Sequence, residues 1–178
     1  QNELFALGRR MFQNRWAFFW FENAEFGRGP TSNAQACTTS TGGSGFQKVP
    51  IVNGLEGPMS FQEDPTTGLI FVIEKAGALK VFDPLDTSIT TVATLAVRTE
   101  AELGLLGIAL DPAFSSNGHV FLYYTKDVAG QPVGTLSRFT VTDSPSWALS
   151  DEHVLLSIPH IVNFHDAGDL KFGPDGNL

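Results

Sequence analysis

The chain has 178 residues, of which 42% are hydrophobic and 17% charged, a composition typical of a folded protein and not of a disordered one. Its 19 acidic and 11 basic residues give a formal net charge of −8 without a basic stripe, which argues against binding to nucleic acid. No apolar run approaches the roughly 20 residues that cross a bilayer as a helix, so we expect no membrane span.

The first residue is Gln1 rather than Met, as in a processed protein. We therefore expect a secreted or periplasmic protein whose signal peptide has been removed, although a cloning boundary would give the same start. Cys37 is the only cysteine, so no disulfide can form within the chain.

Apolar residues recur at intervals of three and four within residues 1–21, which predicts an amphipathic helix. These residues are Leu4, Leu7, Met11, Phe12, Trp16 and Phe19. Residues 22–48 have no such period and are rich in Gly, Ser, Thr and Asn, so we expect an irregular linker there.

From residue 49 to the end, short apolar strands alternate with turns that contain Pro and Gly, and this pattern repeats. The first unit has apolar strands at 60–65 and 69–72, the second has them at 107–112 and 119–122, and a third unit starts at 170–178. The strands that would complete the first two units are expected at 78–82, 89–95, 136–141 and 154–158.

Four short strands in a repeat of about 40 to 50 residues are typical of a β-propeller blade. The predicted fold is therefore all-β, a partial propeller over residues 49–178 with about two blades and the start of a third, preceded by the N-terminal helix. Two blades cannot close the usual ring, so we expect a fragment whose open faces are covered by the remainder of the propeller or by another chain.

Several separated motifs in this region resemble the glucose/sorbosone dehydrogenases and related soluble aldose dehydrogenases. The segment ELGLLGIALDPAF at 102–114 is similar to a hallmark of that family, and NGHVFLYYT at 117–125 continues it. Upstream, GLEGP at 54–58 and FVIEKAG at 71–77 resemble the first blade of the family. Downstream, HDAGDLKFGPDG at 165–176 resembles the strand and turn that carry its active-site histidine.

The resemblance implies a six-bladed propeller that holds pyrroloquinoline quinone, with calcium, at one mouth of its channel. The implied reaction oxidises a hydroxyl of a sugar or a related alcohol, with hydride passing to the quinone. Carried over to this chain, His165 is the catalytic base that takes the hydroxyl proton, and it lies at the cofactor. Glu102 is the second residue that the resemblance places near the cofactor.

The sequence departs from the family pattern beside the histidine. Phe164 precedes it where relatives often have Asp or Asn, and Asp166-Ala167 replaces the more usual Asn-Gly or Gln-Ser. The arginine, lysine and calcium ligands of the family would fall after Leu178. The spacing of the His and Asp residues at 160–169 matches no established ligand pattern, so we expect no metal site within this chain.

A fainter resemblance concerns the N-terminal region. The segment GPTSNAQAC at 29–37, after RRMF at 9–12, is similar to the opening of di-haem peroxidase-like oxidoreductases, in which a haem-attachment Cys-x-x-Cys-His follows. Here the five positions run from Cys37 to Thr41 and lack both the second cysteine and the histidine. We therefore expect no haem.

Two alternatives to an enzyme remain open. The chain could be a catalytically silent propeller used for binding, as in the hedgehog-interacting relatives of the family, and Phe164 favours this slightly. It could also be a structural subunit of an extracellular assembly, docking to other chains through the predicted N-terminal helix and its aromatic run at 16–21.

Overall fold

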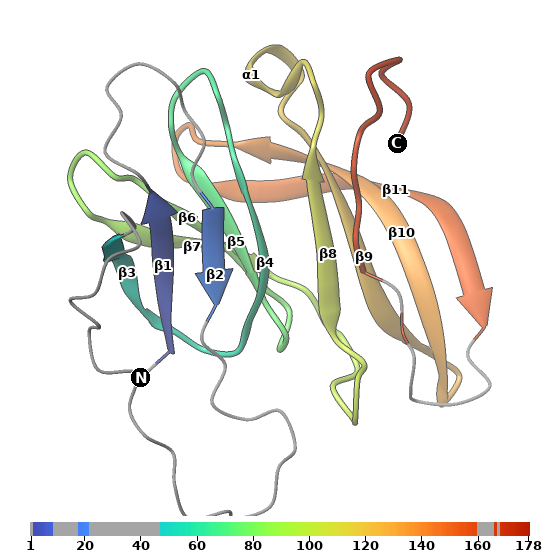
Figure 1. The fold of residues 1–178 in the computed structure, drawn as a ribbon. Helices are drawn as coiled ribbons and strands as arrows, with labels where there is room; N and C mark the ends of the chain where they lie inside the picture. Colours follow the sequence, from blue (N-terminus) through green and yellow to red (C-terminus); the bar gives the residue numbers. More distant parts are fainter. Residues whose placement is uncertain (1, 9–17, 22–46, 160–165, 167) are drawn as a thin grey trace, which may run out of the picture. The chain divides into compact units, whose positions relative to one another are not determined.

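The computed structural model describes residues 2–8, 18–21, 47–159, 166 and 168–178 (Figure 1). The chain divides into two units, Gln1–Leu55 and Glu56–Leu178. In the described part, no helix is both long and apolar enough to cross a membrane.

The first unit is a small antiparallel sheet. It consists of β1 (Asn2–Gly8), β2 (Phe18–Phe21) and β3 (Gln47–Leu55), in the order β2-β1-β3. Phe5 of β1 lies opposite Trp20 of β2, and Leu4 lies opposite Val52 of β3.

The helix predicted over residues 1–21 is therefore wrong where the structure describes this stretch, because residues 2–8 and 18–21 are strands. Short apolar runs are ambiguous between helix and strand, and Phe18–Phe21 is such a run. The long-range pairing of β1 with β3 gives the segment backbone partners that local spacing cannot reveal. Residues 9–17 and 22–46, which include most of the predicted linker, lie outside the described residues.

The second unit begins with a four-stranded antiparallel meander, as the repeat predicts (Figure 1). Its strands are β4 (Pro58–Glu63), β5 (Ile70–Glu74), β6 (Ala78–Phe82) and β7 (Ile89–Thr94). Asp64 ends β4 in a turn in which its carboxylate accepts hydrogen bonds from the backbone N–H of Thr66 and the hydroxyl of Thr67. Such side-chain capping favours the reversal into β5.

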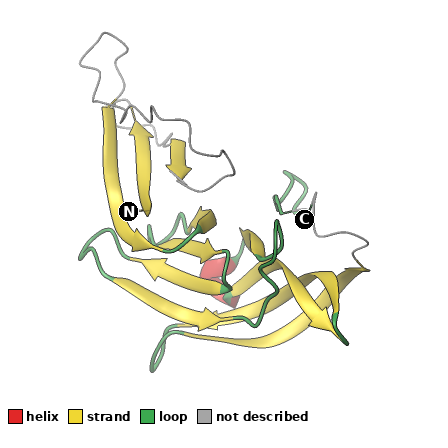
Figure 2. Ribbon diagram, turned by 90° about the horizontal axis from the view of Figure 1, so that it is seen from below, coloured by secondary structure: helices red, strands yellow, loops and turns green. Residues whose placement is uncertain are grey.

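A second meander of the same order follows directly. Its elements are β8 (Leu105–Leu110), the short helix α1 (Phe114–Asn117; red in Figure 2), β9 (His119–Val128), β10 (Gln131–Thr142) and β11 (Ala148–Pro159). The two meanders match the two predicted units strand by strand and confirm a partial propeller, with β4 and β8 as the innermost strands.

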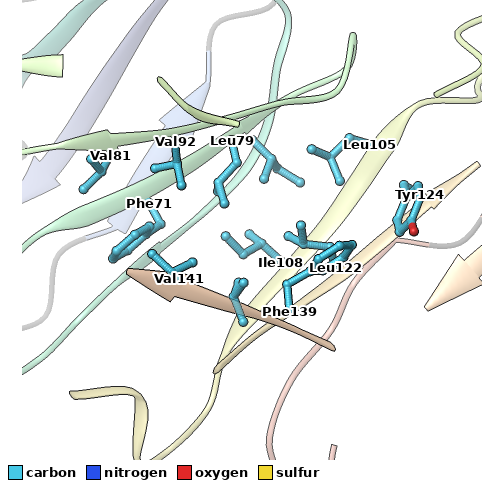
Figure 3. Close-up of a cluster of buried hydrophobic side chains, with 12 residues drawn as sticks. Phe71, Leu79, Val81, Val92, Leu105, Ile108, Leu122, Tyr124, Phe139 and Val141 are labelled. Atoms are coloured by element: carbon cyan, nitrogen blue, oxygen red, sulfur yellow. The ribbon is translucent and has the colours of Figure 1, made fainter. Parts of the chain in front are cut away.

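The core lies between the two blades. Figure 3 shows side chains of both meanders, such as Phe71 of the first and Ile108 of the second, within one buried cluster. Burying one such side chain stabilises the fold by about 1.5 to 3 kcal/mol, so this cluster fixes the two blades against each other.

The segment that follows Gly168 runs along β8. A Cβ atom on Gly107 would lie 2.0 Å from the carbonyl oxygen of Gly168, and the rings of Phe121 and Phe172 meet edge to face at 5.2 Å. The chain thus lies beside the second blade where the innermost strand of a third blade is expected (Figure 1).

Candidate functional site at the start of the innermost strands

The two site residues predicted from the sequence occupy equivalent places in the repeat. Glu102 shortly precedes β8, and His165 shortly precedes the segment from Gly168 that runs along β8. Since Gly168 lies beside Leu106 and Phe172 beside Phe121, which pairs with Ala109, that segment and β8 run in the same direction. The Glu102 turn and the described start of that segment, at Asp166 and Gly168, therefore lie at the end of the blades at which the innermost strands begin.

Thr125 of β9 forms hydrogen bonds to residues that closely follow each of the two predicted site residues. Its backbone N–H donates to the carbonyl oxygen of Gly104 over 2.9 Å, two residues after Glu102. Its hydroxyl donates to Oδ2 of Asp166 over 3.0 Å, one residue after His165. Thr125 is fully buried, so these bonds are shielded from water.

The second oxygen of the Asp166 carboxylate is also held. The hydroxyl of Tyr123 donates to Oδ1 of Asp166 over 2.9 Å. Burial of Tyr123, followed by the hydrogen bond to Asp166 and the charge of that carboxylate, raises the pKa of the phenol. The phenol is therefore protonated at neutral pH and acts as a donor.

His165 itself lies outside the described residues. The structure does describe the residue bonded to it, and the Asp166 carboxylate receives two hydrogen bonds from a strand of the second blade. In the sequence, Asp166 stood out as a departure from the family pattern and as one of the His and Asp residues at 160–169 that match no ligand spacing. The placing of Tyr123 and Thr125 on one face of β9 was a usable signal, because polar groups on a buried strand each need a hydrogen-bond partner.

Glu102 lies in an exposed turn that is anchored on both sides. Leu103 is fully buried and donates its N–H to the carbonyl oxygen of Glu100 over 3.0 Å. From the first blade, Lys75 donates its ammonium to the carbonyl oxygen of Ala101 over 2.5 Å and accepts the N–H of Leu105 on its own carbonyl over 3.0 Å. The turn therefore presents Glu102 outward at this end of the blades.

Arg98 is a further residue that sequence reasoning missed. Its guanidinium bonds both oxygens of Glu100, at 3.1 and 3.2 Å, and one oxygen of Asp127 at 3.2 Å. It also donates to the carbonyl oxygen of Gly130 over 3.0 Å, in the turn between β9 and β10. Arg98 thus ties the loop before β8 to the neighbouring hairpin.

Pyrroloquinoline quinone carries three carboxylates, so a site for it at this end of the blades would need positively charged side chains that are not already paired. Lys75 and Arg98 are engaged with carbonyl oxygens and carboxylates, and Lys126 donates to Glu152 over 2.6 Å. These three cations, among the described residues at this end, are thus already used within the chain. A polyanionic cofactor needs positive groups beyond those described residues, so this geometry by itself defines no chemical step through the quinone.

The described residues also bring together no group of three His, Cys, Asp or Glu side chains suited to a metal ion. A calcium site of the kind implied by the family resemblance would need ligands from elsewhere.

Comparison with known proteins points to one family. The glucose/sorbosone dehydrogenase family matches residues 55–178. Among solved structures, an oxidoreductase (glucose dehydrogenase) from Thermus thermophilus is 32% identical, with a TM-score of 0.60 over 71% of this chain and 36% of its own. The aldose sugar dehydrogenase of Streptomyces coelicolor, solved with pyrroloquinoline quinone bound, shares the fold at 23% identity, with a TM-score of 0.62 over 71% of this chain and 37% of its own.

A relative of another kind is also found. The human Hedgehog-interacting protein is 27% identical over 146 residues, which cover 72% of this chain and 21% of that protein. The mouse protein is 25% identical over the same length. The chain thus spans about a fifth of these relatives and little more than a third of the two dehydrogenase structures.

Proposed function

The chain belongs to the glucose/sorbosone dehydrogenase family, and from this premise we propose that it forms the first blades of a quinone-dependent dehydrogenase that oxidises a hydroxyl of a sugar or a related alcohol. The dehydrogenase structures to which it is similar support this proposal, one of them with pyrroloquinoline quinone bound. Because the chain spans little more than a third of those proteins, the activity belongs to the complete propeller.

In this proposal His165 accepts the proton of the substrate hydroxyl. An imidazole is suited to the role because its ordinary pKa lies close to neutral pH. Asp166 is a positioning residue, since its carboxylate ties the loop of His165 to Tyr123 and Thr125 of β9. The observation that carries the proposal is this anchoring of the histidine loop to a buried strand, within the matched family segment.

When bound, pyrroloquinoline quinone would supply the electron acceptor for the reaction. Glu102 is proposed to lie near it, as an exposed carboxylate on an anchored turn. Calcium is part of the proposal on the strength of the family resemblance alone. Its ligands and the cations that pair with the quinone would come from later blades.

The proposed partners follow from the fold. The substrate is a sugar or alcohol, and the remainder of the propeller or another chain covers the open side of the second blade. Exposed apolar side chains on β11 support such a cover, namely Val154, Leu155, Leu156 and Ile158. We propose a secreted or periplasmic location for the protein.

The test begins with the intact mass of the polypeptide in its source, measured by top-down mass spectrometry. A mass well above that of the 178-residue chain supports the proposal, and a mass of this chain alone contradicts it. The full-length protein is then reconstituted with quinone and calcium and assayed for sugar oxidation with a soluble electron acceptor. His165→Ala should abolish turnover, whereas His153→Ala, which removes an exposed histidine of β11, should retain it.

A catalytically silent binding propeller is the second candidate. The likeness to the Hedgehog-interacting proteins and the apolar Phe164 before the histidine favour it. The discriminating measurement is quinone binding by the full-length protein, followed by equilibrium dialysis. Failure to bind quinone, with a folded protein, favours the silent propeller. A structural subunit is tested by gel filtration, where a stable monomer contradicts it.

A further inference from the structure

A cavity of about 540 Å³ lies between the two blades, at the end where the innermost strands finish. Its walls are the turn between β4 and β5, the helix α1 and the turn between β10 and β11. Glu102 precedes β8 and α1 follows it, so the cavity is at the opposite end of the blades from the Glu102 turn. The volume falls within the roughly 300 to 1,000 Å³ that is usual for small-molecule sites.

The apolar part of the wall includes three aromatic side chains. Phe71 is fully buried and meets Phe114 edge to face at 5.1 Å and Trp147 edge to face at 5.9 Å. Phe114 and Trp147 are only partly buried and line the cavity. One core residue thus contacts two ring systems, one on α1 and one in the turn before β11.

The polar part of the wall is rich in hydroxyl groups. Among the described residues, the hydroxyls of five lining side chains have no hydrogen-bond partner: Thr66, Ser115, Thr140, Thr142 and Ser144. The buried carboxylate of Asp64 is satisfied by Thr66 and Thr67, and the other acidic side chain of the lining, Asp143, is exposed, so a cationic ligand gains little from either.

The described lining has no Lys, Arg or His, so it offers no charge for an anionic ligand. A hydroxyl can both donate and accept a hydrogen bond, so these five hydroxyls suit a ligand that itself carries several hydroxyls. The C–H face of a pyranose is weakly positive and packs on the negative face of an aromatic ring. These features together describe one class of ligand.

We propose that this cavity binds a neutral saccharide, with one sugar ring against Trp147 and its hydroxyls on the Thr and Ser side chains. The proposal does not depend on the dehydrogenase function, because it concerns the other end of the blades and needs no quinone. A cationic amine or an anionic sugar acid would bind more weakly than the neutral sugar of the same size.

The test is isothermal titration calorimetry of the chain, without quinone, against maltose, glucuronate and choline. We expect saturable binding of maltose, with glucuronate and choline at least about tenfold weaker. Trp147→Ala should weaken maltose binding about tenfold, while Trp147→Phe retains most of it. His165→Ala should leave binding unchanged, which separates this site from the proposed catalytic end.

Two further variants show whether the cavity itself is occupied. Ser115→Arg fills the cavity from α1 and should abolish binding, whereas Ser157→Arg puts the same side chain on an exposed position of β11 and should not. Circular dichroism verifies that each variant is folded. The proposal is overturned if maltose gives no saturable binding, if choline or glucuronate binds as tightly, or if Ser115→Arg and Ser157→Arg behave alike.

Discussion

Thr125 of the second blade is bonded to Asp166, the residue that follows His165 in the sequence. The hydroxyl of Thr125 donates to Oδ2 of Asp166 over 3.0 Å, and the backbone N–H of the same residue donates to Gly104 over 2.9 Å. One buried residue of β9 is thus bonded both to the turn of Glu102 and to the residue after His165.

Replacing Thr125 by Val removes the hydroxyl and keeps the shape of the side chain. We expect the free energy of unfolding to fall by about 1 to 2 kcal/mol, because a hydrogen bond to a carboxylate is lost. Urea denaturation of the chain measures the change. Thr140→Val is the matched control on β10, since its hydroxyl bonds no described residue, and it should cost far less. Equal losses in the two variants would contradict the anchoring role of Thr125.

The two tyrosines of the chain, Tyr123 and Tyr124, give a direct spectroscopic test. Burial raises the pKa of both phenols, and the hydrogen bonds to Asp166 and Glu152 raise them further. Below the ordinary tyrosine pKa of about 10, both states keep the proton and stability does not depend on these groups. Above it, the unfolded chain loses protons that the folded chain retains, so the free energy of unfolding falls as pH rises.

The measurement is an alkaline titration in which tyrosinate absorbance and circular dichroism are followed together. We expect tyrosinate to appear above the ordinary tyrosine pKa and in step with unfolding. Tyr123→Phe should halve the amplitude of the absorbance change. Ionisation at about pH 10, with the circular dichroism unchanged, would show that the phenols are not held as the structure has them.

The blade strands could be predicted from the sequence because each is a short apolar run closed by a turn with a local chemical cause. Asp64, for example, caps the turn after β4 with its own carboxylate. The family resemblance that the motifs at 102–114 and 165–176 indicated is confirmed, since the family matches residues 55–178.

What the sequence could not supply were contacts between distant residues. The strand β1 (Asn2–Gly8) pairs with β3, which is distant in the sequence. The spacing of Leu4 and Leu7 could not reveal this pairing and by itself favoured a helix. Arg98 and Thr125 likewise act through partners in other loops. The roles of Glu102 and His165 stay predictions.

Gly107→Ala tests how the segment after Gly168 lies along β8. A Cβ at residue 107 would fall 2.0 Å from the carbonyl oxygen of Gly168, far inside any contact that atoms tolerate. We expect the segment to be displaced, which hydrogen exchange at residues 168–173 would report as faster exchange. Gly68→Ala is the comparison, because its Cβ meets nothing within 4 Å and only the positive φ of 78° is strained. Slow exchange in Gly107→Ala would mean that the close approach is absent.

Glu74 and Lys80 form a buried ion pair within the first blade. The ammonium lies 2.6 Å from Oε1 of Glu74, whose side chain is 5% exposed, and the same oxygen accepts the N–H of Glu56 over 2.7 Å. Lys80→Met leaves this carboxylate buried with one partner fewer, so we expect the free energy of unfolding to fall by about 3 kcal/mol.

The surface pair of Lys171 and Asp169 provides the control for this prediction. Its side chains are 72% and 81% exposed, so Lys171→Met should change the free energy of unfolding very little. Both variants remove one lysine, one from a largely buried ion pair and the other from an exposed one. Adding Glu74→Gln to Lys80→Met should restore part of the lost stability, because the uncompensated charge is removed while the bond from Glu56 can be kept. No recovery in urea denaturation of the double variant would mean that packing, rather than the buried charge, sets the cost.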